Sequence, residues 1–533
     1  MPRPAFPGHR WRFCLSLLCA VLLALGAGVI SLSAQPQCAV ASSIRFPVDR
    51  SVFSLAQDYA TPSVRHQGRY HTGEDWHAER GATAGQPVFA IANGRVTYAS
   101  PTAWGRDGGV IIIEHTFAEG TVAYSMYGHI TDATGIQFPA ALTCIREGDM
   151  LAAIADVRPA PHLHFEIRTQ NPGTPGAGYV WENPAEIGLR RPSKFVLNMQ
   201  TWLSDSYRWR LDLADEVAPL SPPVTLPDNS LIYADAGRVV RASPDGRVLW
   251  RINADSPVVG VIPFGDAALI LYADGRAQPV ALDATLTAAW NASAGFSSPP
   301  YRLGNDRVAL RDSSGALLVY NNDLRTPIWT LAGVDPLYDV ISTTRTIGLM
   351  TEANEALIVD ADSGTLIHRG LLREPGTWAI APDGGLLAYT LGGLWSVSAD
   401  GVWTLYAQDV PGGGRGGAVA FARDGRLFAY DGDILRAYGS APAFAPLWQV
   451  DVPDTLGRAE LAVYEPAVLL TTSDGHIIAL QAESGGLCNR AQIWGDWRAG
   501  LWRWLAPDGL LRVYAADQIL ALQWSRFLLA CNS

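Results

Sequence analysis

The chain has 533 residues, enough for roughly three to four average domains, or for two if one of them is a large β architecture. Hydrophobic residues make up 48% of it and charged residues only 17%, so disorder is excluded as the dominant state. The formal net charge is −11 and the only lysine is Lys194, which argues against the basic face that a wrapped nucleic acid requires.

An apolar segment near the N-terminus predicts export. Arg3, Arg10 and Arg12 precede an almost uncharged apolar run over 13–34, and the small residues 39–41 follow it. This order is typical of a signal peptide, with Ala41 as one candidate cleavage point. Because the run has about 22 residues and about 20 suffice to span a bilayer, an uncleaved N-terminal membrane anchor is the alternative. In both cases we expect residues 1–41 to place the rest of the chain outside the cytoplasm.

Four of the six cysteines lie beyond the apolar run and can form disulfides in an oxidising compartment. They can pair as Cys38–Cys144 and Cys488–Cys531, which keeps each pair within one of the two regions described below. Cleavage after Ala41 would remove Cys38, so this pairing and that cleavage point exclude each other. The alternative is that the four cysteines are buried free thiols.

Residues 42–187 have the pattern of an all-β domain and contain most of the histidines. Eight of the ten histidines lie before residue 165. Short apolar, β-branched segments such as 88–92, 110–114 and 162–168 are separated by Gly-containing turn signals. The Pro/Gly cluster over 171–178 and the Asn183-Pro184 step close this domain.

A connector is expected over 188–227, and a repetitive region over 228–533. Within the connector we expect a short helix around 197–203 and a stiff Pro-rich stretch over 219–227. From residue 228 a unit of polar turn, apolar strand, Asp-Gly-type turn and second strand recurs with a period of about 40 residues, which is typical of a β-propeller. The units begin near Asn229, Asp266, Asn305, Thr344, Asp383, Asp424, Glu465 and Asp508. We count eight blades, or seven if the terminal pieces combine into one.

A tryptophan ends most of these units. The positions are Trp250, Trp290, Trp329, Trp403, Trp448 and Trp524, with His368 and Cys488 near the two remaining places. We interpret this residue as packing between blades rather than as a stack for a cofactor. The pattern resembles quinoprotein-like and tryptophan-docking propellers. The region has neither a calcium-ligand set nor an adjacent cysteine pair, so the resemblance implies the fold and no redox activity.

Three motifs in residues 42–187 contain side chains that can bind a metal. They are His71-Thr-Gly-Glu-Asp75, Tyr127-Gly128-His129 and Pro161-His162-Leu163-His164-Phe165-Glu166. Zinc accepts imidazole nitrogen and carboxylate oxygen, and a hydrolytic site uses three such ligands with a fourth position for water. Gly73 lies between His71 and Asp75 and favours a strand-edge loop over a helix there. His162 and His164 would share one face of a strand, so that one can bind metal while the other faces a substrate.

In order and spacing, these motifs resemble the lysostaphin/LytM-type zinc metalloendopeptidases, a family of peptidoglycan peptidases. The family pattern is H-x-x-x-D, then Y-x-H, then H-x-H followed by F-E. The segments 86–96 and 109–115 also resemble two of the family's strands. The resemblance covers residues 44–187 and implies the duplicated hybrid motif, a small antiparallel β fold.

The resemblance implies that His71, Asp75 and His164 bind Zn²⁺ and that His129 and His162 form a catalytic pair that does not bind metal. One of the pair would accept a proton from water and the other would stabilise the oxyanion or protonate the leaving amine, with the assignment left open. Glu166 shares the strand face and can orient a ligand histidine. The remaining nearby histidines, His66, His77 and His115, are interpreted as structural or surface residues, and Glu74 is given no role.

One departure concerns the approach to the H-x-H strand. The family has a Gly/Ser/Thr-rich stretch there, whereas residues 154–161 read Ile-Ala-Asp-Val-Arg-Pro-Ala-Pro. This difference affects the wall of the groove, so substrate preference transfers less well than metal binding.

The sequence therefore predicts an exported zinc endopeptidase that hydrolyses peptide bonds of cell-wall peptidoglycan and uses the propeller for binding or positioning. One alternative is a non-catalytic envelope regulator whose peptidase-like domain binds cell-wall enzymes. Another is a protease that cleaves an extracellular protein captured by the propeller, whose ligand the sequence does not identify.

Overall fold

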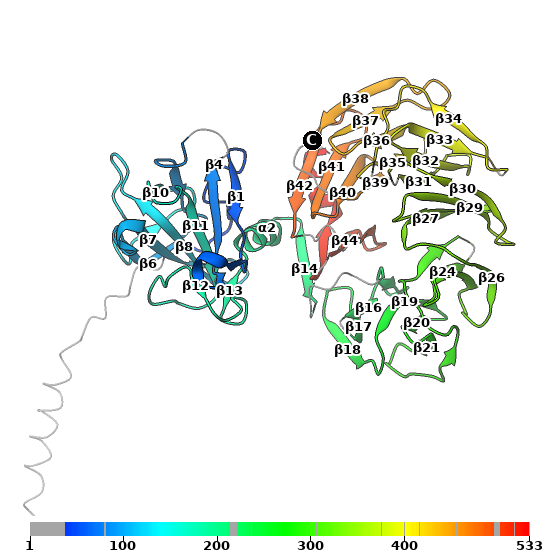
Figure 1. Cartoon of the computed structure of the whole chain (residues 1–533), viewed down its shortest axis with the longest axis horizontal. Coiled ribbons are helices and arrows are strands. Elements are labelled where there is room, and N and C mark those ends of the chain that lie inside the picture. Colours follow the sequence, from blue (N-terminus) through cyan, green and yellow to red (C-terminus); the bar gives the residue numbers. More distant parts are fainter. Residues whose placement is uncertain are drawn as a thin grey trace, which may run out of the picture.

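The computed structural model describes residues 38–78, 82–213, 221–235, 237–304, 306–374, 376–398, 400–414, 416–452, 457–494, 502–515 and 517–531 (Figure 1). Nearly all of the predicted signal peptide or anchor lies outside these residues. Within them, no helix combines the length and the apolar character needed to span a bilayer. Strands dominate both halves of the molecule, which confirms the predicted all-β class.

The N-terminal β domain is built on one large antiparallel sheet and one small one. Its long strand pairs join segments far apart in the chain, so residues from distant motifs become neighbours. The large sheet runs in the order β1 (Phe53–Gln57), β4 (Glu74–Ala78), β11 (Leu163–Arg168), β8 (Val122–Thr131), β7 (Gly109–Thr116), β6 (Gly94–Ser100) and β9 (Cys144–Ile145), with β10 (Met150–Ile154), β5 (Pro87–Phe89) and β13 (Leu189–Arg190) at its sides. The small sheet runs β12 (Tyr179–Val180), β3 (Arg69–His71) and β2 (Pro62–Ser63), and two 3₁₀ turns, η1 (Val64–His66) and η2 (Gly105–Asp107), complete the domain.

Strand β11 shows how the sequence pattern divides the core from the site. Leu163, Phe165 and Ile167 alternate along the strand and pack into the main hydrophobic core. Side chains of a strand alternate between its two faces, so His164 and Glu166 point to the opposite face. The two polar residues are buried as well, and the site therefore lies on a covered face of the sheet.

Both predicted disulfides are present, and the first one ties the start of the described chain to the domain. Cys38 is bonded to Cys144, and Cys488 to Cys531. Ala41 is buried, and its N–H donates to the Thr116 carbonyl at 2.8 Å. These contacts favour retention of Cys38 over the candidate cleavage after Ala41.

Among the described residues, the propeller consists of eight four-stranded antiparallel sheets. This agrees with the predicted count of eight blades rather than the alternative of seven. The first four blades are β15 (Val224–Thr225), β16 (Leu231–Asp235), β17 (Arg238–Ala242), β18 (Val248–Asn253); β19 (Val258–Phe264), β20 (Ala267–Tyr272), β21 (Arg276–Val280), β22 (Trp290–Asn291); β23 (Tyr301–Leu303), β24 (Arg307–Arg311), β25 (Leu317–Asn321), β26 (Pro327–Leu331); and β27 (Leu337–Ser342), β28 (Thr346–Thr351), β29 (Glu355–Asp360), β30 (Leu366–Leu371). The next three are β31 (Thr377–Ile380), β32 (Leu386–Thr390), β33 (Gly393–Val397), β34 (Trp403–Ala407); β35 (Ala418–Phe421), β36 (Leu427–Tyr430), β37 (Ile434–Tyr438), β38 (Pro446–Asp451); and β39 (Ala459–Tyr464), β40 (Ala467–Thr472), β41 (His476–Gln481), β42 (Leu487–Gln492).

The eighth blade closes the ring with a strand from the front of the propeller. It consists of β14 (Tyr207–Asp212), β45 (Gln518–Gln523), β44 (Leu510–Ala515) and β43 (Trp502–Leu505). Both β14 and β15 lie in the stretch expected as a connector, so the propeller begins before residue 228. The outer-strand tryptophan of this blade is Trp209, whereas Trp524 begins the short helix α3 (Trp524–Phe527), which the turn η3 (Leu529–Cys531) follows. A repeat pattern read forward along the chain cannot reveal a pairing between its two ends.

The interpretation of the recurrent tryptophan as a packing residue between blades is supported by its hydrogen bonds. In four blades the indole Nε1–H donates to a carbonyl of the following blade at 2.9–3.1 Å. The pairs are Trp250 with Leu282, Trp290 with Leu324, Trp329 with Ala361, and Trp448 with Ala482. At two of these contacts a glycine is required, since a Cβ on Gly364 or Gly485 would lie 2.5 or 2.7 Å from the indole ring.

Helix α2 (Pro192–Trp202) lies between the two domains and belongs to the packing of both (Figure 1). It begins five residues before the helix expected at 197–203. Val196, Leu197 and Met199 complete the core of the N-terminal β domain. On the other side Trp202 packs against a hydrophobic cluster of the propeller. Polar contacts add to this: Asn198 Oδ1 accepts from the Trp494 N–H at 2.8 Å, Thr201 Oγ1 donates to the Gln492 carbonyl at 3.0 Å, and the ammonium of Lys194 lies 2.6 Å from Asp517.

Candidate metal centre

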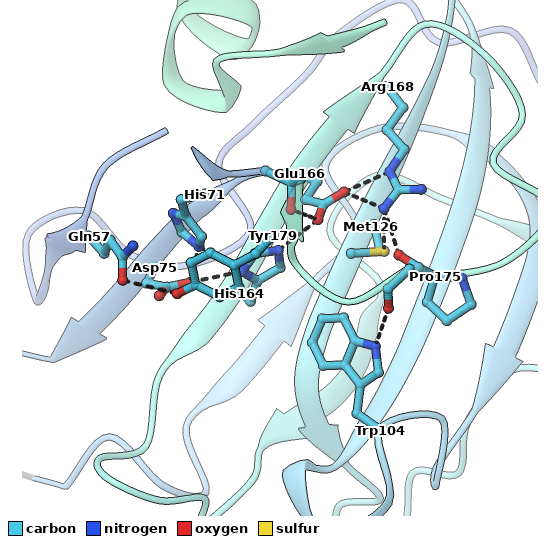
Figure 2. Close-up of polar contacts among 12 residues, drawn as sticks. Gln57, His71, Asp75, Trp104, Met126, His164, Glu166, Arg168, Pro175 and Tyr179 are labelled. Carbon is cyan, nitrogen blue, oxygen red and sulfur yellow. Dashed lines mark hydrogen bonds and ion pairs between the residues drawn. The ribbon is translucent and has the colours of Figure 1, made fainter. Parts of the chain in front are cut away.

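Three of the predicted site residues bring their donor atoms together on the covered face of the large sheet. His71 ends β3, Asp75 lies on β4, and His164 lies on β11 directly opposite Asp75. Asp75 Oδ1 is 3.1 Å from His71 Nε2 and 2.9 Å from His164 Nδ1, and the two nitrogens are 3.1 Å apart (Figure 2). All three residues are buried. Two imidazole nitrogens and a carboxylate oxygen at this spacing can hold a metal ion.

Gly73 makes this arrangement possible. The chain turns between His71 and Glu74 from the small sheet into the large one, as the predicted strand-edge loop requires. At the turn the backbone passes so close to β11 that a Cβ on Gly73 would lie 2.3 Å from the Phe165 carbonyl oxygen. Any larger residue would push the turn, and with it Asp75, away from His164.

The far nitrogen of each candidate ligand histidine, His71 and His164, contacts an acceptor oxygen. His71 Nδ1 lies 3.1 Å from the Asp58 carbonyl, and His164 Nε2 lies 2.8 Å from Glu166 Oε1. Because these oxygens accept only, they select the tautomers that leave His71 Nε2 and His164 Nδ1 facing the centre. The orienting role suggested for Glu166 thus has the required geometry.

Glu166 is itself held in a chain of contacts. Its carboxylate accepts from Thr72 Oγ1 at 2.5 Å and from Arg168 Nε at 2.6 Å (Figure 2). Arg168 Nη2 donates onward to the Pro175 carbonyl at 2.6 Å. The candidate ligand His164 is thereby connected to the segment 171–178, which passes along the edge of the site.

The buried charges stabilise one another. Burial alone would raise the pKa of Asp75, but hydrogen bonds with His164 and His71 outweigh it and hold that pKa far below its ordinary value. Burial would likewise raise the pKa of Glu166, yet the Arg168 guanidinium and His164 lower it to about 2. Both carboxylates are therefore ionised at neutral pH. Burial would lower the pKa of His164, but the two carboxylates outweigh this effect and raise that pKa to about 9. A bound cation would therefore replace a proton on His164.

His129 and His162 stand together beside the three ligand candidates. Their ring centroids are 4.4 Å apart, and His162 Nε2 is 3.6 Å from Asp75 Oδ2. His129 Nδ1 lies 2.7 Å from the Asp107 carbonyl, and His162 Nδ1 lies 2.8 Å from the Ala160 carbonyl. Each Nδ1 therefore carries the proton, which leaves each Nε2 with a free electron pair in the neutral ring. Burial and the neighbouring His162 and His164 lower the pKa of His129 to about 4, so its ring is neutral at neutral pH.

The other nearby histidines have different surroundings. His115 is buried, and its two ring nitrogens lie 2.8 Å from the Asn93 carbonyl and 2.7 Å from Ser125 Oγ, as expected for a structural residue. His66 is closer to the site than the sequence suggested. Its ring stacks at 3.6 Å on Tyr179, whose other neighbour is His71 at 5.1 Å.

Three residues near the centre have contacts that the sequence motifs did not indicate. Tyr179 covers His71 from β12, and Trp104 lies 4.8 Å from the ring of His129. Glu74, adjacent to Asp75, accepts a hydrogen bond from Ser193 Oγ at 2.6 Å and one from the Ser193 N–H at 3.2 Å, at the start of α2. Burial raises the pKa of Glu74 to about 7 although the Ser193 hydrogen bonds oppose the rise. The strand of Asp75 is thus joined directly to the helix between the domains.

Comparisons with known proteins agree with both halves of this description. Residues 69–175 match the model of Peptidase family M23, and residues 202–332 match a model described as outer membrane protein assembly factor BamB. Among solved structures, BamB from Moraxella catarrhalis is 16% identical with a TM-score of 0.44, over 60% of this chain and 99% of that one. Sqt1 from Saccharomyces cerevisiae is 9% identical with a TM-score of 0.45, also over 60% of this chain and 99% of that one.

A search of curated proteins found no match to the chain. The resemblance carried by the three histidine motifs is confirmed at the level of the family. Residues 69–175 are an M23-type peptidase domain, and a propeller that matches the BamB model over residues 202–332 follows it in the same chain.

Proposed function

We propose that this chain is a zinc-dependent endopeptidase that hydrolyses peptide bonds of cell-wall peptidoglycan. The observation that supports this proposal most is the convergence of His71, Asp75 and His164 within hydrogen-bonding distance. The histidine pair His129 and His162 lies beside them. Three ligands of this kind with an open fourth position are the donor set of hydrolytic zinc sites.

His71 Nε2, Asp75 Oδ1 and His164 Nδ1 would hold the metal. When bound, zinc lowers the pKa of water toward about 7 and polarises the scissile carbonyl. His129 and His162 each direct Nδ1 to a backbone carbonyl, so in the neutral ring either can accept the proton of the attacking water at Nε2. The histidine that takes up this proton can then pass it to the leaving amine, and the other can donate a hydrogen bond to the oxyanion when its own Nε2 carries a proton.

The combination of domains supports the proposed substrate and location. The M23 match supports peptides of peptidoglycan as the substrate, and the BamB description supports the cell envelope as the location. Two disulfides fit an oxidising compartment, which an export signal or anchor in residues 1–41 would reach. The propeller would bind a protein of the envelope and so place the peptidase near its substrate.

Digestion of defined peptidoglycan tests this function. Purified zinc-loaded protein is incubated with intact sacculi and with soluble muropeptides, and new amino termini are identified by mass spectrometry. We expect peptide-bond cleavage that disappears in His164→Ala. His115→Gln serves as the matched control, because His115 is a buried histidine of the same domain outside the metal centre.

Two results would overturn the proposal. If zinc-loaded wild-type protein releases no new termini from any of these substrates, it is not a peptidoglycan peptidase. If a cellular phenotype of the gene deletion is rescued fully by His164→Ala, the domain acts as a scaffold for cell-wall enzymes instead.

A further inference from the structure

Trp104 lies between the proposed catalytic pair and the proposed metal ligands, and no sequence motif predicts its position there. Its ring lies 4.8 Å from the ring of His129 and meets His164 edge-on at 5.5 Å. Its backbone begins the turn η2, so the indole and the turn are one unit. Trp104 therefore contacts a residue from each half of the proposed chemistry.

The turn that follows Trp104 holds the proton of His129. The Asp107 carbonyl accepts from His129 Nδ1 at 2.7 Å, and the Asp107 N–H donates back to the Trp104 carbonyl at 3.1 Å. The Trp104 N–H donates to the Gly108 carbonyl at 3.0 Å, which closes the turn. His129 also has a left-handed backbone with φ of 59°, a conformation that costs energy unless the surroundings enforce it.

The indole is fixed from two further directions. Its Nε1–H donates to the Gly176 carbonyl at 2.8 Å, next to the Pro175 carbonyl that Arg168 holds (Figure 2). On its other side the ring lies directly over Gly128, where a Cβ would be 2.2 Å from Trp104 Cζ3. Because Gly128 of the Tyr127-Gly128-His129 motif has no side chain, the Trp104 ring can pack against the backbone there.

We propose that Trp104 is the positioning residue of His129, an inference that rests on the proposed peptidase function. The ring limits the rotation of the imidazole, and the turn behind it fixes the Nδ1 tautomer, so Nε2 stays aimed at the reacting water. Without the indole, His129 loses its packing partner on that side and samples orientations in which Nε2 is out of reach. The metal ligands keep their own contacts with Asp58 and Glu166.

Trp104→Ala and Trp104→Phe in the zinc-loaded full chain test this role. In Trp104→Ala we expect kcat on a peptide substrate to fall by about 10-fold or more, with KM and zinc content unchanged, because a displaced base affects the chemical step. Trp104→Phe keeps a ring on His129 and should recover most of the kcat. Trp181→Ala, at a tryptophan that is 62% exposed in the same domain, is the matched control.

A second readout does not depend on activity. Carbethoxylation of neutral imidazoles by diethyl pyrocarbonate, followed by peptide mass spectrometry, measures how accessible His129 is. We expect its labelling rate to rise severalfold in Trp104→Ala, relative to His368 in the propeller as internal reference, and to stay at the wild-type value in Trp181→Ala.

The outcomes separate the two proposals. Wild-type kcat together with unchanged His129 labelling in Trp104→Ala would overturn the positioning role, and so would a loss of kcat that follows a loss of zinc. A wild-type protein that binds zinc and cleaves nothing would overturn the peptidase function alone, because the labelling of His129 still decides whether Trp104 holds it.

Discussion

The two domains bury polar groups in different ways. In the M23-type domain, His71, Asp75 and His164 come from three separate strands and meet at one point among the described residues. In the propeller, the same indole N–H to carbonyl contact recurs in four of the blades. A unique cluster concentrates chemistry at one point, whereas a repeated contact distributes stability around a ring. The two regions should therefore respond to substitution in opposite ways.

The largest effect is expected from Asp75→Asn. The amide has the shape of the carboxylate but lacks the negative charge that both histidines contact at 2.9–3.1 Å. We expect loss of zinc at stoichiometric concentrations and of peptide cleavage, since removal of a direct ligand exceeds the roughly 10- to 100-fold typical of its supporting partners. Metal analysis after gel filtration measures it. Full zinc content in the variant would remove Asp75 from the ligand set.

The next largest effect, on stability rather than on metal, is expected from Trp329→Ala. Its side chain is buried and donates to the Ala361 carbonyl, so truncation leaves a cavity and an unpaired carbonyl at about 3–5 kcal/mol. Calorimetry should show a lower unfolding temperature with zinc content intact. Leu371→Ala, at a side chain that is 78% exposed in the same domain, should change stability by less than about 0.5 kcal/mol. Equal effects of the two variants would contradict the interpretation of Trp329 as a packing residue between blades.

Glu166→Gln should weaken the metal centre without abolishing it. The amide keeps a contact with His164 but loses the charge that pairs with Arg168 and His164. We expect zinc affinity to fall by about 10- to 100-fold, measured by competition with a chelator. Glu114→Gln is the control, because Glu114 pairs with Arg95 away from the centre. An affinity equal to that of wild type would show that Glu166 does not orient the ligand.

The smallest effect concerns the joint between the domains. Burial raises the folded-state pKa of Glu74 to about 7 from an ordinary 4.5. A raised pKa means that the folded form keeps its proton longer than the unfolded chain, so stability is lost as pH rises through 7. Between pH 6 and 8 the loss should be about 1 kcal/mol in denaturant titrations, and Glu74→Gln should remove that part of the pH dependence. A wild-type slope that persists in the variant would assign it to other groups.

The parts of the fold that could be predicted are those written in short stretches of sequence. His162 and His164 share a strand face with Glu166 by simple alternation, and the resemblance of three short motifs to a known family implied the candidate ligand set. The blades repeat every 40 residues or so, with an outer-strand tryptophan in most of them. In each case neighbouring residues contain the whole signal.

What could not be predicted depends on pairings between distant segments. Strand β14 pairs with β45, although nearly the whole sequence of the propeller lies between them. The repeat pattern therefore did not indicate Trp209 and included Trp524 instead. Trp104 reaches His129 only because η2 folds back over β8, and Glu74 meets Ser193 only through the docking of α2. Propensity and periodicity carry no information on such contacts.

A zinc titration of metal-depleted protein, with peptide cleavage followed at each addition, tests the central claim most directly. If His71, Asp75 and His164 form one catalytic zinc site, activity should be absent at the start, rise linearly with zinc and stop rising near one equivalent per chain. Cleavage by the metal-free protein, or no cleavage once one zinc is bound, would contradict the account.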